Sequence, residues 1–284
     1  MDASRTTIEV LLRTPAAHHD VLMAELLDLG AEAFAAEGEV LRAYVPAAAW
    51  SEARREAVRA ALHGADPGGM MDVREVPAQN WNAAWEASIT PVLIEPFLIT
   101  PTWRPVPDPP EDLHVLQIDP KMSFGTGHHE TTRLMLQLMP GHVPTGARVL
   151  DAGSGTGVLA IAAARLGATH VVAFDIDPRT EDNIDENVTR NAVADRVTAF
   201  IGTLEEAPAG PYDVILANIN FNTLVAYLPG FVDRLAPGGH LLLSGLLTTD
   251  RDALRQAAAR FPLAETADVT EGDWWAVAFS HTST

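Results

Sequence analysis

The chain has 284 residues, room for about two domains, and its 47% hydrophobic and 20% charged residues are typical of a globular protein. It contains no cysteine, which excludes disulfides, thiolate nucleophiles and cysteine-ligated metal sites. The net charge of −19 disfavours a broad phosphate-binding surface and favours a basic partner, although an acid excess that only aids solubility fits equally well.

The N-terminal segment lacks a basic region followed by an apolar run, so we expect no signal peptide. No apolar run anywhere in the chain is long enough to cross a bilayer. We therefore expect a cytoplasmic protein that is not attached to a membrane.

Residues 1–75 predict a small α+β domain. An alternating stretch and two helix-spaced stretches, separated by two short strand-like segments, give the order strand, helix, strand, strand, helix. The segments are 6–13, 18–29, 31–35, 40–45 and 47–62. This order favours a ferredoxin-like sandwich, and none of its residues has a catalytic pattern.

Residues 76–117 predict a connection between two domains. Residues 64–69 are rich in turn formers, and residues 79–86 predict a short helix with two tryptophans four positions apart. Residues 91–100 look strand-like, and residues 101–112 hold five prolines that enforce an extended loop. The connection is therefore predicted to be a linker helix followed by a Pro-rich segment.

A glycine-containing loop at 118–132 leads into a predicted helix. Gly125 and Gly127 free its backbone, and Thr131 or Thr132 can cap the helix. Such a loop can close over a bound ligand, although an ordinary capped connection has the same pattern.

Three neighbouring residues in this loop invite a metal-binding interpretation, namely His128, His129 and Glu130. We reject it because adjacent residues rarely converge on one ion, and the i, i+4 helical spacing of zinc ligands is absent. No metal site is predicted.

A strand, a glycine-rich turn and a helix follow at residues 148–162. Gly153, Gly155 and Gly157 let the backbone turn sharply and approach a ligand that a Cβ atom would block. The spacing is G-x-G-x-G, whereas a dinucleotide-binding turn is G-x-G-x-x-G, so an NAD-dependent oxidoreductase is disfavoured.

Two acidic residues accompany this turn. Asp151 closes the strand before it, where a carboxylate would repel a pyrophosphate but suits a cationic ligand. Asp175 ends the next strand, 22 residues beyond Gly153, near the distance at which nucleoside-binding α/β folds place an acid on the ribose hydroxyls.

The rest of the chain alternates strands and helices, which predicts a parallel, doubly wound sheet with right-handed crossovers. The predicted strands are 148–151, 171–174, 197–201, 212–219, 240–243 and a last, antiparallel one at 274–279. The predicted helices are 178–191, 222–235 and 250–260. Asp151, Asp175 and Asn218 all end strands, at the edge where ligands bind in such folds.

These motifs together resemble class I S-adenosylmethionine (SAM) methyltransferases, and more closely the PrmA family, which modifies a large-subunit ribosomal protein. The resemblance covers roughly residues 79–247. It rests on Asp119-Pro120, Phe124-Gly-Thr-Gly127, His129, Thr131-Thr132, the Asp151–Gly157 turn, Asp175-Ile-Asp-Pro178, Ala217-Asn-Ile219, Pro237-Gly-Gly239 and Leu242-Leu-Ser-Gly245.

The resemblance implies a Rossmann-like SAM-binding domain over 118–284 and a substrate-recognition role for residues 1–75. It also implies a set of cofactor-binding residues, namely Phe124, Thr132, Asp151, Gly153, Gly155, Gly157, Asp175 and Asn218. Asn218 and the carbonyl of Ile219 are the candidate catalytic groups, because both can accept hydrogen bonds from an amine and direct its lone pair. The expected reaction is methylation of lysine side chains or of an α-amino group of that ribosomal protein.

The chain departs from the family pattern at His128, at Glu130 and at Asn220-Phe221. Asn218-Ile-Asn-Phe221 partly echoes the motif of exocyclic-amine methyltransferases, so one rival is a nucleic-acid methyltransferase in which Phe221 stacks the base. The net charge and the lack of a basic cluster count against it, and we expect no direct nucleic-acid binding. A second rival is a SAM-binding assembly factor without catalysis.

Overall fold

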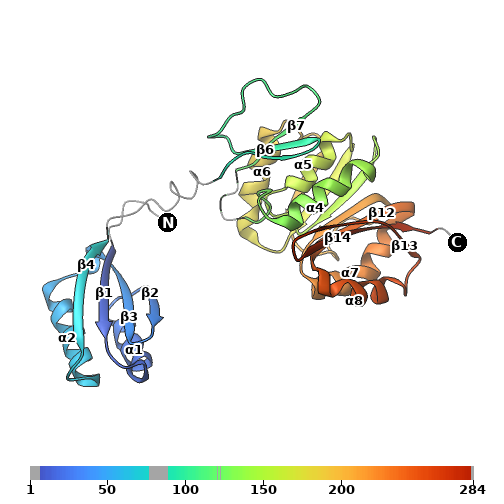
Figure 1. The fold of residues 1–284 in the computed structure, drawn as a ribbon. Coiled ribbons are helices and arrows are strands. Elements are labelled where there is room, and N and C mark those ends of the chain that lie inside the picture. Colours follow the sequence, from blue (N-terminus) through green and yellow to red (C-terminus); the bar gives the residue numbers. More distant parts are fainter. Residues whose placement is uncertain (1–6, 77–88, 120, 122, 283–284) are drawn as a thin grey trace. The chain divides into compact units, whose positions relative to one another are not determined.

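The computed structural model describes residues 7–76, 89–119, 121 and 123–282 (Figure 1). The chain divides into two compact units, Met1–Ser88 and Ile89–Thr284, and each has its own hydrophobic core. The helix predicted at 79–86 lies outside the described residues.

The first unit is an antiparallel sheet with two helices, in strand order β2-β3-β1-β4. Its elements are β1 (Thr7–Arg13), α1 (His19–Asp28), β2 (Ala33–Glu37), β3 (Val40–Pro46), α2 (Glu52–Ala65) and β4 (Met70–Val76), with short 3₁₀ turns at Ala16–His18 and Ala47–Ala49. The ferredoxin-like prediction is confirmed, and β4 is the strand that the sequence analysis missed. It pairs along the whole of β1, so the turn-rich stretch at 64–69 lies within this unit.

The second unit is built on a seven-stranded sheet in the order β10-β9-β8-β11-β12-β14-β13. The strands are β8 (Arg148–Ala152), β9 (His170–Asp175), β10 (Val197–Ile201), β11 (Tyr212–Asn218), β12 (Leu235–Leu247), β13 (Leu263–Glu271) and β14 (Trp274–His281). The first five in the order are parallel, and β14 is antiparallel to both of its neighbours. The predicted doubly wound α/β fold is therefore confirmed.

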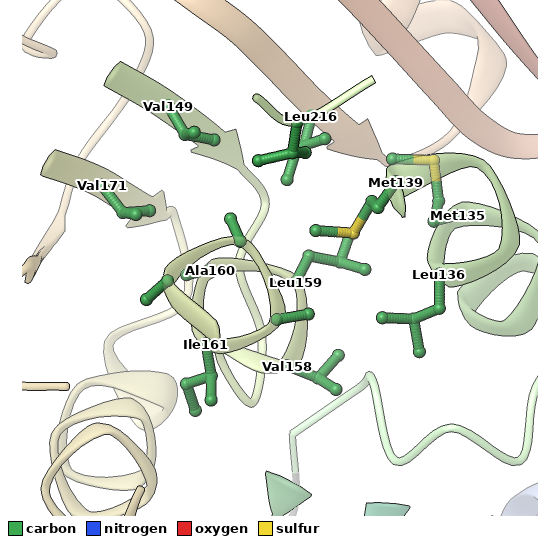
Figure 2. Packing of buried hydrophobic residues seen from close by; sticks show 14 of the residues in the cluster. Met135, Leu136, Met139, Val149, Val158, Leu159, Ala160, Ile161, Val171 and Leu216 are labelled. Atoms are coloured by element: carbon green, nitrogen blue, oxygen red, sulfur yellow. The ribbon is translucent and has the colours of Figure 1, made fainter. Parts of the chain in front are cut away.

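Helices cover both faces of this sheet (Figure 1). They are α4 (Glu130–Leu138), α5 (Val158–Arg165), α6 (Glu181–Arg190), α7 (Phe221–Arg234) and α8 (Arg251–Ala258), with 3₁₀ turns at Met139–Gly141, Pro178–Thr180 and Thr248–Asp250. Side chains of α4, α5 and α6 form one buried cluster with the sheet, and side chains of α7 and α8 form another. Figure 2 shows Met135 of α4 and Met139 of the 3₁₀ turn after it, packed with Leu159 of α5 beside Leu216 of β11.

Residues 89–117, which the sequence analysis assigned to a linker, belong to the second unit instead. They contain a three-stranded sheet of β5 (Val92–Ile94), β6 (Phe97–Thr100) and β7 (His114–Gln117). Phe97, Ile99 and Leu116 are buried in the same cluster as α4 and α5. This burial of apolar side chains is the physical reason why the segment is part of the domain.

The last third of the chain has more strand than the sequence analysis predicted. β12 begins at Leu235 and includes Pro237–Gly239, whereas the predicted strand covered only residues 240–243. β13 was not predicted, and it forms the edge of the sheet. In the described part of the chain, no helix is long and apolar enough to cross a membrane.

Candidate functional site

A cavity of about 360 Å³ opens at the carboxyl ends of β8, β9 and β11. The chain runs from β8 to β9 and β10 on one side and then crosses back to β11 on the other side of β8. Ligands of doubly wound sheets bind at such a reversal. Six residues expected from the sequence line this cavity, namely Phe124, Gly153, Gly155, Asp175, Asn218 and Ile219.

Asp175 is held in place by two backbone N–H groups. One carboxylate oxygen accepts a hydrogen bond from the N–H of Gly155 at 2.8 Å, and the other accepts one from the N–H of Asp177 at 3.0 Å. Each carboxylate oxygen has a second lone pair. The arrangement therefore orients the carboxylate toward the cavity and leaves it able to accept bonds from ligand hydroxyls.

The glycine turn is shaped by close contacts as well as by the cavity. A Cβ on Gly153 would lie 2.3 Å from Cγ2 of Ile219, and a Cβ on Gly155 would lie 2.3 Å from the carbonyl oxygen of Phe124. Both glycines have positive φ angles, 77° and 53°, which disfavour any side chain. Gly157 is not among the cavity residues, because it lies at the start of α5 and spaces that helix from Ile184.

Asp151 lies beneath the turn and is not among the cavity residues. Its side chain is fully buried, one carboxyl oxygen accepts the N–H of Ala160 at 3.0 Å, and the other has no partner among the described residues. Burial raises the pKa of Asp151 to about 7, opposed by the bond from Ala160 and reinforced by the charge of Asp175. The structure thus places Asp151 behind the cavity wall rather than on its surface.

Asn218 is the last residue of β11 and lines the cavity. The carboxamide oxygen is shielded from solvent and accepts no hydrogen bond from the described residues. The carboxamide nitrogen lies 3.5 Å from Oγ1 of Thr132, a fully buried residue of α4. Thr132 therefore supports Asn218 from behind and does not line the cavity itself.

Ile219 follows Asn218 and is confined by glycines. Besides the contact with Gly153, a Cβ on Gly245 would lie 2.3 Å from the carbonyl oxygen of Ile219. Gly245 has a φ of 83°, so the backbone of β12 approaches Ile219 in a conformation that other residues rarely adopt. The position of the Ile219 carbonyl is therefore fixed by its neighbours.

Two rings of the loop before α4, Phe124 and His129, form a row of ring contacts with Trp274 of β14. Phe124 is 53% exposed, its ring centroid lies 5.2 Å from that of His129, and the His129 ring lies 4.7 Å from that of Trp274. His129 also caps α4, because its Nδ1 accepts the N–H of Thr131 at 3.3 Å. The predicted cap at Thr131 or Thr132 is therefore wrong. Within the described residues, no group of three or more acidic or histidine side chains is placed to hold a metal.

The departure at Asn220-Phe221 has a local explanation. The side chain of Asn220 caps α7 by accepting the N–H of Thr223 at 3.0 Å. Phe221 packs partly buried against the core cluster of α7 and α8 and is not among the cavity residues. The base-stacking role that the nucleic-acid rival needs therefore has no support in this geometry.

Sequence reasoning missed several cavity residues, among them Ser123, Phe174, Ile176, Thr180 and Tyr227. Ile176 directly follows Asp175, and a residue next to a strand-end acid is a signal that would have found it. Tyr227 comes from the second turn of α7, and no short-range pattern marks it.

These residues fit the cofactor that the sequence resemblance implies. The strand-end carboxylate of Asp175 suits ribose hydroxyls, the glycine turn leaves room for a close backbone approach, and the unpaired oxygen of Asn218 suits a donor near the reacting end. Apolar surface from Phe124, Phe174 and Ile176 suits the flat face of a base.

Comparison with known proteins gives the same answer. The family model "Ribosomal protein L11 methyltransferase (PrmA)" matches residues 7–282. A ribosomal protein L11 methyltransferase from Chlorobaculum parvum is 37% identical over 275 residues, 94% of each chain. Another from Trichlorobacter lovleyi is 41% identical over 222 residues, 76% of this chain and 72% of the relative.

Among solved structures, the ribosomal protein L11 methylase from Lactobacillus delbrueckii subsp. bulgaricus superposes with a TM-score of 0.64 at 27% identity, covering 69% of this chain and all of that one. The match to the family model spans both structural units, and the cavity lies where a class I methyltransferase binds its cofactor. The chain belongs to the ribosomal protein L11 methyltransferase (PrmA) family, and it is an enzyme whose cofactor is SAM.

Proposed function

We propose that this chain methylates amines of ribosomal protein L11 of the large subunit, on lysine side chains, on the α-amino group, or on both. Its relatives are named ribosomal protein L11 methyltransferases, which supports the substrate, and the geometry of Asn218 supports an amine as the acceptor. A ribosomal protein substrate also implies a cytoplasmic reaction.

The observation that carries the proposal is the unpaired carboxamide oxygen of Asn218. A buried carbonyl without a partner costs about 1–3 kcal/mol, so such a group persists where a ligand supplies the missing donor. Thr132 lies at the nitrogen end of the same carboxamide, so the oxygen end keeps its unused acceptor, which a rotation of the side chain would turn toward a ligand in the cavity. A neutral amine has the N–H donors that this oxygen lacks.

SAM supplies a methyl group that its sulfonium already activates, so the protein mainly has to position the acceptor. Asn218 and the carbonyl of Ile219 accept hydrogen bonds from the amine and direct its lone pair. With SAM bound, the amine would gain one N–C bond in place of the S–C bond of the cofactor and would lose one proton. Among the described cavity residues the ionisable side chains are Asp175, Asp177 and Tyr227. Asp175 is expected to accept the ribose hydroxyls, Asp177 binds Arg179, and a phenol such as that of Tyr227 is a poor proton acceptor, so we assign the proton to solvent.

The test is single-turnover transfer from methyl-labelled SAM to purified L11 by the Asn218→Ala variant. We expect the rate constant to fall by at least about tenfold while the SAM dissociation constant changes little, because the lost bond acts on the transition state. Asn222→Ala, a change at an exposed position in the same stretch, is the matched control. A normal rate in Asn218→Ala would refute the role, and label in RNA rather than in L11 would favour the nucleic-acid rival.

None of the described residues of the first unit lines the cavity. We propose that it recognises the protein substrate, because a methyl-transfer cavity offers little surface to a folded partner. The net charge of −19 supports a basic partner for the chain as a whole.

A further inference from the structure

Helix α6 and the residue that follows it bury three asparagines on one face. Asn183 and Asn187 are fully buried and Asn191 is 1% exposed, although the rest of the helix is mostly polar and α6 lies at the protein surface. Residues four apart share a helix face, so the three carboxamides form a ladder along α6. Buried carboxamides are unfavourable unless they are hydrogen-bonded, and this ladder therefore needs partners.

Two of the asparagines pair with the backbone of the segment that runs from the last residue of β7 toward the cavity. Asn191 accepts the N–H of Gln117 at 2.9 Å and donates to its carbonyl at 2.8 Å. Asn187 accepts the N–H of Asp119 at 3.1 Å, and its nitrogen lies 3.3 Å from the carbonyl oxygen of Asp119. Each side chain thus pairs with the backbone of this segment.

The spacing explains why both pairs form together. Four residues of α-helix rise about 6 Å, and two residues of extended chain rise about 6.6 Å. The segment runs antiparallel to α6, so it comes closer to the cavity from Gln117 to Asp119 and Ser123. Asn183 continues the series with a 3.2 Å bond from its nitrogen to Oγ of Ser123, a cavity residue.

Charged pairs tie the same segment to the outer side of the helix. Lys121 donates to Glu186 at 2.7 Å, and Arg190 approaches Asp119 at 3.5 Å. Because these pairs are partly exposed, they add less to the attachment than the buried carboxamides do.

Asn187 differs from Asn191 because it also touches the glycine turn. Its nitrogen donates to the carbonyl oxygen of Thr156 at 3.0 Å and to Oδ1 of Asn183 at 2.9 Å, the two shortest of its acceptor contacts. Thr156 in turn donates its N–H to the carbonyl of Phe124 at 2.9 Å and its hydroxyl to the carbonyl of Gly125 at 2.7 Å. Asn187 therefore joins two walls of the cavity, the one that carries Phe124 and the glycine turn itself.

We propose that Asn187 is a positioning residue for the cofactor cavity, because it fixes the segment before Phe124 against the glycine turn. The wall is then held in the binding geometry before the ligand arrives, which lowers the cost of ordering it on binding. The proposal rests on the cofactor of the family and is independent of which amine accepts the methyl group.

The test compares Asn187→Leu with Asn191→Leu in the full chain. Both replace a buried carboxamide that pairs with the same segment, so we expect both to lower the urea midpoint of unfolding to a similar extent. Asn187→Leu should raise the dissociation constant and the KM for SAM by at least about tenfold, the scale of one or two lost hydrogen bonds. Asn191→Leu should change them by less than about threefold. Equal effects of the two variants on SAM binding would overturn the proposal.

Asn187→Asp gives a second readout that also serves if Asn187→Leu fails to fold. Its carboxylate can still accept the N–H of Asp119 and lies beside Arg190, but it cannot donate to the carbonyl of Thr156. We therefore expect Asn187→Asp at pH 8 to raise the dissociation constant for SAM by at least about tenfold, whereas Asn191→Asp should change it by less than about threefold. Equal effects of these two variants on SAM binding would contradict the positioning role.

Discussion

The Asp151→Asn substitution isolates the free energy of burying a carboxyl group beneath the glycine turn. Asp151 is fully buried, and its pKa is raised from 3.8 in an exposed chain to about 7 in the folded protein. The folded state therefore binds a proton that the unfolded state has already released between these two values. Stability from this group is complete below pH 3.8 and is lost as the pH rises to about 7.

The magnitude follows from the two pKa values. A shift from 3.8 to about 7 corresponds, at 1.36 kcal/mol for each pH unit, to about 4 kcal/mol, and the part between pH 5 and pH 7 is about 3 kcal/mol. Asparagine has nearly the same shape, cannot ionise, and keeps an oxygen for the N–H of Ala160. We therefore expect the variant to gain about 3 kcal/mol relative to the wild type when the pH rises from 5 to 8.

The assay is urea unfolding of both proteins at pH 5, 6, 7 and 8 without SAM, since a bound cation would itself favour the carboxylate. Other titrating groups are common to both proteins, so the difference between the two free energies of unfolding reports Asp151 alone. A difference that stays constant over this range would show that Asp151 does not take up a proton on folding.

Three further changes test the rest of the site. Asp175→Ala should weaken SAM binding by about 1–3 kcal/mol because its carboxylate is expected to accept the ribose hydroxyls, and unchanged affinity by calorimetry in a folded variant would remove the assignment. Gly245→Ala places a Cβ 2.3 Å from the carbonyl oxygen of Ile219, so we expect kcat to fall by at least about tenfold with little change in SAM affinity; normal turnover would argue against a role for that carbonyl. A chain that begins near Val76 should bind SAM as the full chain does but lose most methylation of L11, and full retention of that activity would show that the first unit serves another purpose.

Much of the site was predictable because its residues carry local signals. An apolar strand that ends in a polar residue marks Asp175 and Asn218. Three closely spaced glycines mark the turn after β8, the strand that lies between β9 and β11 in the sheet. The same signals could not separate the cavity surface from the layer behind it. Asp151, Gly157 and Thr132 belong to that second layer, and their place depends on how α4, α5 and α6 pack.

Other elements lacked a local signal altogether. β13 is an edge strand with polar residues at most positions, so it has little of the apolar alternation that identifies strands. Phe97 and Ile99 lie in a short apolar run next to a Pro-rich stretch, and only the contact with α4 and α5 shows that the run belongs to the core. Asn187 looks like any polar residue of a surface helix, because its partners are 68 and 31 positions away.

The contact between Lys121 and Glu186 also bears on which chains the enzyme modifies. Lys121 is the single lysine among 284 residues, and the other basic side chains that stay charged are 18 arginines, whose guanidinium groups are not nucleophilic amines. Glu186 holds this lysine along the outer side of α6. A catalyst that alkylates amines thus presents almost no competing acceptor of its own, even at the high concentrations of a single-turnover experiment. Methyl label that enters the enzyme itself should be confined to Lys121 and the N-terminal amine. The label found in L11 therefore measures transfer to the substrate, with little background from methylation of the enzyme.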